Sequence, residues 1–257
     1  MGSRRIKSNK VYIMDRVLVL RTCDENMRSF GGFQWPESGN VSAPDWDPKP
    51  ECGNGLHGLL WGEGDGSLLY GRAASKWLVC SVDPERIVDL DGKVKFPECE
   101  VVHAGDMASA ATYIYENGGQ DRAIYGLVIN LGADAECKAG DRSYVTVSHN
   151  SKVSAGMWAR IIGGLNCTLT GGKFANIAGR SWSTISGGDF SYLTGGLGST
   201  LIAGECSSFS GGVGSTFISL RSYGVSGERR SSTAYVDGVE YLPNTKYMCV
   251  NGHWSKV

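Results

Sequence analysis

An eight-residue repeat runs through residues 143–222 and constrains the fold more than any other feature of this 257-residue chain. The first position of each octad is always small, the third is always apolar, and the fifth is mostly Gly or Ala. Such alternation is typical of β-strands, and a Gly-rich step in a proline-free repeat indicates tight turns between short strands. The apolar third positions are Val145, Val153, Ile161, Leu169, Ile177, Ile185, Leu193, Leu201, Phe209 and Phe217.

Two octads, rather than one, make a coil long enough to enclose a core. Two sets of residues recur sixteen apart: Trp158, Phe174 and Phe190, and Thr168, Thr184, Thr200 and Thr216. Stacked coils would align each set as a ladder with a step of ~4.8 Å. We therefore predict a β-solenoid of about five sixteen-residue coils over 143–222, because a disordered Gly/Ser linker has no reason to keep ten apolar residues in phase.

The repeat resembles that of a known family. The stretch GGLGSTLIAGECSSFSGG is similar to the repeats of bacterial ice-nucleation proteins, whose pattern is Ala-Gly-Tyr-Gly-Ser-Thr-x-Thr-Ala-Gly. Leu197 stands at the Tyr position, and Ile202 replaces the second Thr after Thr200. The resemblance covers about a third of the chain and implies the solenoid architecture. Because the array is short and its Thr-x-Thr face is incomplete, we expect the fold without the activity.

The flanking segments predict two further units. Residues 1–142 read as a small α+β domain, with a strand pair over 10–23, a hairpin turning at Asp91-Gly92, a helix over 106–119 and a further strand over 123–132. Residues 223–257 contain two hairpin signals, one at Asp237-Gly238 and one at Asn251-Gly252. We expect these hairpins to cap the open end of the solenoid, since exposed strand edges invite aggregation.

The segment from Cys52 to His57, Cys-Gly-Asn-Gly-Leu-His, is the most distinctive motif of the N-terminal domain. It resembles an uncharacterised domain of bacteriophages and bacteria, which suggests a phage or mobile-element origin. The domain also bears a faint resemblance to ADP-ribosyltransferases. That resemblance implies NAD as cofactor, with Arg21 and His57 gripping it and Glu100 (or Glu98) stabilising the transition state.

Each of these residues also has a purely structural interpretation. Arg21 suits the charged end of a strand, and His57 suits local hydrogen bonding in a Gly-rich turn. Glu98 and Glu100 alternate on one strand face and suit a solvated position. The enzyme hypothesis is therefore kept as the alternative.

Charge, hydropathy and cysteine spacing narrow the classes of function and cellular location that the chain can have. The net charge is −1, and the repeat region carries five basic and two acidic residues, so neither nucleic-acid binding nor mimicry of its phosphate backbone is indicated. No run of eighteen apolar residues indicates a membrane span. The eight dispersed cysteines form no Cys-x-x-Cys pair, which favours reduced, mostly buried thiols in a cytoplasm over disulfides or a metal site.

These observations predict a non-enzymatic, protein-binding accessory protein, located in a host cytoplasm and acting on a partner such as a host or defence factor. A rigid rod presents flat, repetitive faces suited to another protein. The alternative is an ADP-ribosyltransferase-like enzyme with the solenoid as a targeting arm. The predicted binding residues form one exposed column: Thr168, Thr184, Thr200 and Thr216.

Overall fold

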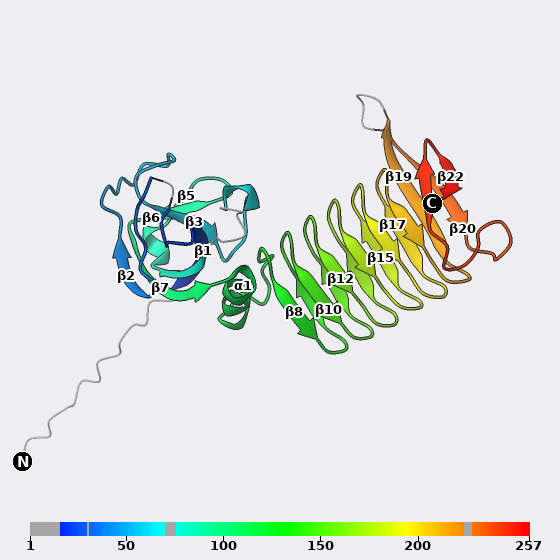
Figure 1. Ribbon diagram of the computed structural model, residues 1–257, viewed down its shortest axis with the longest axis horizontal. Coiled ribbons are helices and arrows are strands. Elements are labelled where there is room, and N and C mark those ends of the chain that lie inside the picture. The colour runs from blue at the N-terminus through cyan, green and yellow to red at the C-terminus, as the bar shows by residue number, and fades with distance from the viewer. Residues whose placement is uncertain (1–15, 30, 70–75, 224–227) are drawn as a thin grey trace, which may run out of the picture.

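A computed structural model describes residues 16–29, 31–69, 76–223 and 228–257 and shows a sheet domain joined to a stack of short strands (Figure 1). The first fifteen residues, and with them part of the predicted strand pair, lie outside the described residues. The α+β domain, the solenoid and the terminal hairpin of the predicted fold class are all confirmed.

The N-terminal domain is built on a seven-stranded antiparallel sheet with strand order β2-β7-β4-β1-β3-β6-β5. Its central strands are apolar on both faces, because Val19 and Leu20 of β1 pack into separate cores on opposite sides. The predicted turn at Asp91-Gly92 joins β5 to β6 with positive φ at both residues. The strands are β1 Val17–Cys23, β2 Gly39–Ser42, β3 Leu56–Leu60, β4 Lys76–Val82, β5 Val88–Asp89, β6 Val94–Phe96 and β7 Glu98–Gly105, with 3-10 turns at Gly66–Leu68 and Pro84–Arg86.

Helix α1, Met107–Glu116, links the sheet domain to the solenoid. Asp106 and Ser109 form a capping box that satisfies the first backbone N–H groups, as the sequence predicts for a helix beginning there. Ala110 and Ile114 are buried in a core that continues from the sheet through Leu127 into the coils. The two parts therefore share one hydrophobic core rather than meeting through a linker.

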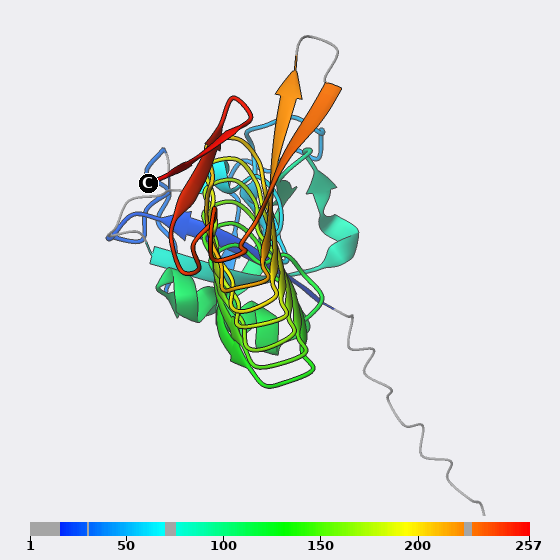
Figure 2. The same cartoon turned by 90° about the vertical axis from the view of Figure 1, so that its right-hand side faces the viewer.

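From β8 onward the chain winds into six coils, and each coil gives one strand to each of two parallel sheets (Figures 1 and 2). Residues sixteen apart are direct neighbours, as in the row Ile161, Ile177 and Leu193. The first solenoid sheet holds β8 Val128–Leu131, β10 Tyr144–Val147, β12 Arg160–Ile162, β14 Asn176–Ala178, β16 Tyr192–Thr194 and β18 Ser208–Ser210. The second solenoid sheet holds β9 Glu136–Lys138, β11 Lys152–Ser154, β13 Thr168–Thr170, β15 Thr184–Gly187, β17 Thr200–Ala203 and β19 Thr216–Tyr223.

The stack begins one coil earlier than the octad register that the sequence shows from residue 143. Ile129 and Cys137 keep the third position apolar, but Leu127 occupies a first position that is small in every later octad. Leu127 is fully buried in the core shared with the N-terminal domain, so a large side chain is required there. The strand expected over 123–132 therefore belongs to the solenoid, as β8, and not to the preceding domain.

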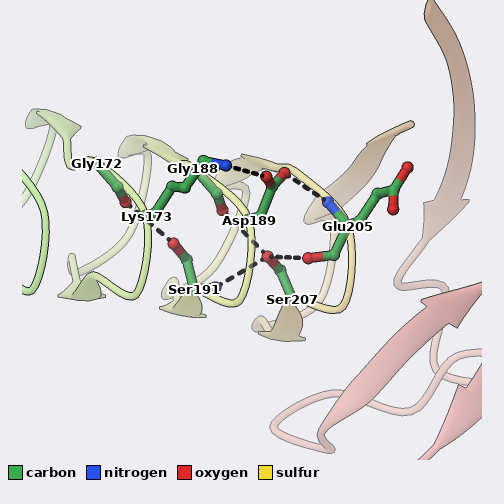
Figure 3. Close-up of polar contacts among 7 residues, drawn as sticks. All are labelled: Gly172, Lys173, Gly188, Asp189, Ser191, Glu205 and Ser207. Atoms are coloured by element: carbon green, nitrogen blue, oxygen red, sulfur yellow. Dashed lines mark hydrogen bonds and ion pairs between the residues drawn. The ribbon is translucent and has the colours of Figure 1, made fainter. Parts of the chain in front are cut away.

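The interior of the coils has an apolar column and a serine column. All ten third-position side chains from Val145 to Phe217 are buried, which confirms the predicted facing. First-position serines form hydrogen bonds between coils: Ser207 Oγ accepts from the Ser191 N–H (3.0 Å) and donates to the Gly188 carbonyl (3.2 Å) (Figure 3). Each such serine forms hydrogen bonds with buried backbone N–H and C=O groups at the corners, which the pairing between parallel strands does not satisfy.

Every eighth residue from Asp134 to Gly214 turns the corner with a positive φ. Gly and Asn adopt this left-handed conformation most readily, yet Trp158, Phe174 and Phe190 also adopt it, with φ of 59–60°. The corner geometry is thus set by the repeat and imposed on aromatic residues that disfavour it.

The C-terminal segment covers the last strand of both solenoid sheets. β20, Glu228–Tyr235, pairs antiparallel with β19, and the hairpin of β21, Tyr247–Val250, and β22, His253–Lys256, pairs with β18. The predicted turn at Asn251-Gly252 is confirmed, with positive φ at both residues. The hairpin predicted at Asp237-Gly238 is wrong. β20 before the turn pairs with β19, residues 236–246 form no strand, and Asp237 holds this loop by accepting three backbone N–H groups.

Candidate functional site

The predicted threonine column, Thr168, Thr184, Thr200 and Thr216, lies along the outer face of the second solenoid sheet. The register places the four residues side by side in β13, β15, β17 and β19. Thr168 and Thr184 are exposed, whereas Thr200 and Thr216 are half-buried. A second column lies beside it, formed by the residues two positions later in each strand. This column holds Thr170 and Ser186 but continues with Ile202, so only two coils carry hydroxyl groups in both columns.

A second surface is formed by the corners that directly follow β11, β13 and β15. The rings of Trp158 and Phe174 stack at 4.2 Å between centroids and 6° between planes, and Phe174 and Phe190 stack at 5.2 Å and 10°. The three residues are 55%, 37% and 46% exposed, and Met157 beside them is exposed as well. We call Met157, Trp158, Phe174 and Phe190 the aromatic edge; its signal in the sequence was the sixteen-residue recurrence of large rings.

Charged groups surround the aromatic edge and hold its backbone. Lys173 Nζ pairs with Asp189 Oδ2 at 3.0 Å, and Asp189 Oδ1 accepts the Glu205 N–H at 3.1 Å (Figure 3). Asp141 Oδ1 accepts the Met157 N–H at 2.8 Å in the same way. The corners are thus tied to one another from coil to coil, and the aromatic rings sit on a rigid support.

The N-terminal domain contains a pocket of about 660 Å³ beside the ends of β1 and β3. Arg21 projects from β1, its Nη1 donates to the His57 carbonyl at 3.1 Å, and its guanidinium lies 4.0 Å from the centre of the Trp35 ring. Lys93 and Cys52 lie on the wall, with Nζ and Sγ 3.0 Å apart. We call this cavity the Arg21 pocket.

The Arg21 pocket is positively charged and partly shielded from solvent. Burial, followed by the charges of Lys93, Arg21 and Lys95, lowers the pKa of His57 to about 4, so its ring is neutral at pH 7. The hydrogen bond from Lys93 lowers the pKa of the Cys52 thiol below its ordinary value. The pairing of Cys52 with Lys93 was not predictable from the sequence, because the two residues are 41 positions apart.

Glu100 does not join Arg21 and His57. It lies on β7 opposite Ser81 of β4, and its neighbours Cys99 and Val101 point into the core on the Arg21 side of the sheet. Since side chains alternate along a strand, Glu100 projects from the opposite face. Glu98 is on that face too and pairs with Arg86. The structure therefore brings together two of the three residues suggested for NAD chemistry.

All eight cysteines lie in described parts of the chain and are free thiols. Six are buried, as the sequence predicts, while Cys52 and Cys206 are exposed. Along the described ranges, no helix combines the length and the apolar character needed to cross a bilayer.

Fold and surfaces together define a β-solenoid repeat protein that carries an N-terminal antiparallel-sheet domain. Residues 17–112 match a family described as a domain of unknown function (DUF7666). The chain is also similar to ice nucleation protein InaU of Pantoea ananas, with 38% identity over 148 residues, 55% of this chain and 14% of that protein. An ice nucleation protein of Pseudomonas syringae is 46% identical over 103 residues, 39% of this chain and 9% of the relative.

An ice nucleation protein of Xanthomonas campestris pv. translucens is 38% identical over 125 residues, which is 48% of this chain and 8% of the relative. The chain thus spans less than a sixth of the length of these curated relatives. The similarity supports the predicted ice-nucleation-like character of the repeat. No solved structure matches the chain.

Proposed function

We propose that the solenoid is a protein-binding arm and that its partner docks on the aromatic edge. The observation that carries this proposal is the stacked, exposed ladder of Trp158, Phe174 and Phe190. Contiguous exposed apolar groups surrounded by polar residues are typical of interaction sites. The three rings are also held in a backbone conformation that their residue types disfavour.

The composition of this surface suits a protein partner. Aromatic side chains at the centre of an interface supply most of its binding energy, and a polar rim excludes water. Here the Lys173–Asp189 pair and Glu205 form that rim. Because the corners are tied together by hydrogen bonds, little conformational entropy is lost when a partner binds. That the partner is a host or defence factor, and that the protein is of phage origin, remain predictions.

The repeat itself provides the variant that tests this surface. Asn150 and Asn166 occupy the same octad position at the corners of the opposite edge and also have a positive φ. Replacing Trp158, Phe174 and Phe190 together by Asn should therefore remove the aromatic surface without changing the backbone. The matched control is Trp182→Asn, since Trp182 is a 64% exposed corner residue of the opposite edge.

The measurement is a quantitative comparison of partner retention by the parent and the variants. We expect the triple Asn variant to lose a partner that the parent and Trp182→Asn both retain, at equal circular dichroism signals. Sedimentation of the parent alone separates a second copy of the chain from a different partner. Equal retention by all three proteins would contradict the proposal.

The threonine column offers an adjoining surface that the same partner can reach. The double variant Thr184→Arg with Thr200→Arg tests it, because both side chains project from the outer face of the second solenoid sheet. If this variant loses the partner while the triple Asn variant keeps it, the docking surface is the sheet face and not the aromatic edge.

Ice is a second candidate ligand, because the relatives are named ice nucleation proteins and the threonine column is continuous. The geometry favours it less. On this face only two coils carry paired hydroxyls, at Thr168 with Thr170 and at Thr184 with Ser186, and the second position of the pair is Ile in the next coils. We expect no meaningful ice nucleation in a droplet-freezing assay. Freezing close to 0 °C at low protein concentration would reverse this ranking.

The alternative function, an ADP-ribosyltransferase-like enzyme with the solenoid as its targeting arm, stays a prediction. The contact between Arg21 and His57 supports this alternative. The position of Glu100 on the opposite face of the sheet argues against it. Labelling of a target from NAD that is lost in Glu100→Gln, at an unchanged melting temperature, would support the enzyme. Absence of NAD binding in calorimetry would exclude it.

A further inference from the structure

The Arg21 pocket has the size and the lining of a small-molecule site, which the protein-binding arm does not require. Its volume of about 660 Å³ lies within the ~300–1,000 Å³ of ordinary ligand pockets. Phe33 and Trp35 supply an apolar wall, and their rings meet edge to face at 5.6 Å.

The charged groups around this space are predominantly cationic. Arg21 and Lys93 line the pocket, and Lys95 lies behind them with its Nζ donating to the Glu51 carbonyl at 2.9 Å. Asp45 is the carboxylate among the described lining residues, and its Oδ1 already accepts the Gly55 N–H. Within the described parts of the chain, neither Arg21 nor Lys93 forms an ion pair with a carboxylate.

Three residues that line the pocket each carry a buried polar atom without a partner. Arg21 Nε, Trp35 Nε1 and His57 Nε2 form no hydrogen bond. Buried polar atoms without a partner are costly, so a pocket whose lining residues carry three of them calls for a ligand group that Arg21 and His57 can reach after a small adjustment. Burial is the largest cause of the lowered pKa of His57, and the charges of Lys93, Arg21 and Lys95 lower it further.

We propose that the Arg21 pocket binds a small organic anion, with its phosphate or carboxylate held by Arg21 and Lys93 and its apolar part against Phe33 and Trp35. A guanidinium presents a planar fork that matches the oxygens of either acid, and an ammonium adds a point charge. Bound there, the anion competes with Cys52 for Lys93 Nζ and covers the Cys52 thiol.

Cys52 provides a direct readout of binding, and Cys206 provides the internal control. These two are the exposed cysteines of the chain, one in the pocket wall and the other at a solenoid corner. The experiment measures the rate of iodoacetamide alkylation at each cysteine by mass spectrometry, at constant ionic strength, with pyrophosphate, AMP or citrate as probe. Pyrophosphate and AMP report a phosphate site, and citrate a carboxylate site.

We expect at least one probe to slow alkylation of Cys52 by a factor of 1 + [L]/Kd, about tenfold at roughly ten times its Kd, and to leave Cys206 unchanged. Lys93→Gln and Arg21→Gln should each reduce this protection toward none, with binding checked by calorimetry. Lys49→Gln is the matched control, because Lys49 is an exposed cation outside the pocket lining.

Three outcomes would overturn the proposal: none of the three probes protects Cys52, a probe slows both cysteines equally, or protection persists unchanged in Lys93→Gln. The Lys93→Gln variant keeps the test decisive if Arg21→Gln fails to fold, because the Lys93 side chain is only half-buried and leaves no buried cavity. None of these outcomes depends on the aromatic edge, so the test is independent of the proposed protein-binding function.

Discussion

Replacing Ile177 tests how strongly the stacked coils depend on the apolar column. Ile177 is completely buried between Ile161 and Leu193 of the neighbouring coils. The interior around it is full, since a Cβ placed on Gly171 would lie 2.9 Å from Ile177 Cδ1. Truncation therefore leaves a cavity that the backbone ladders on either side prevent from collapsing.

Two substitutions at this position give a graded expectation. Ile177→Ala should destabilise the chain by about 2–5 kcal/mol, the usual cost of such a truncation in a core. For a chain of this size each kcal/mol corresponds to about 2–4 °C, so the melting temperature should fall by roughly 5–20 °C. Ile177→Asp adds an unpaired buried charge, which costs several kcal/mol more, and should unfold the rod around β14.

The matched control is Asn176→Asp, which introduces the same carboxylate one residue earlier on the exposed face of the same strand. Thermal melts followed by circular dichroism compare the three variants with the parent. We expect Asn176→Asp to melt within a few degrees of the parent. If Ile177→Asp melts with it, the assignment of inward and outward faces in the solenoid is wrong.

Three further predictions concern polar groups. Ser199→Ala should cost about 1–3 kcal/mol, measured by urea denaturation, because it removes the hydrogen bond to the Arg180 carbonyl and the acceptor for the Ser183 N–H in the preceding coil. Lys93→Ala should raise the pKa of Cys52, so the pH profile of its alkylation should move to higher pH while that of Cys206 stays. The folded state holds the pKa of His57 near 4, below the unfolded value of 6.5; the unfolded chain therefore binds more protons in this window, and stability should fall as the pH drops from 6.5 toward 4. His57→Gln should flatten that part of the stability profile, and an unchanged profile would contradict the assignment of a buried neutral ring.

The solenoid could be predicted from the sequence because every coil repeats the same local sequence features. An inward apolar side chain such as Ile177, a small first residue and a corner that tolerates positive φ recur every eight residues, and stacking adds only neighbours sixteen positions away. The turns at Asp91-Gly92 and Asn251-Gly252 were predictable for the same reason, since each depends on two adjacent residues.

The first coil, the C-terminal pairing and the Arg21 pocket were decided only by tertiary structure. Leu127 is large at a position that is small in later octads because it fills a core shared with another domain, and β20 pairs with β19 rather than with a strand after Asp237. In the N-terminal domain, strand order brings Arg21 to His57, and the face of β7 that packs on the core leaves Glu100 on the opposite side. Octads and turns are local and periodic, so the sequence alone determined them; which distant strands become neighbours depends on burying the whole chain at once, and the candidate ligand site arises from that choice.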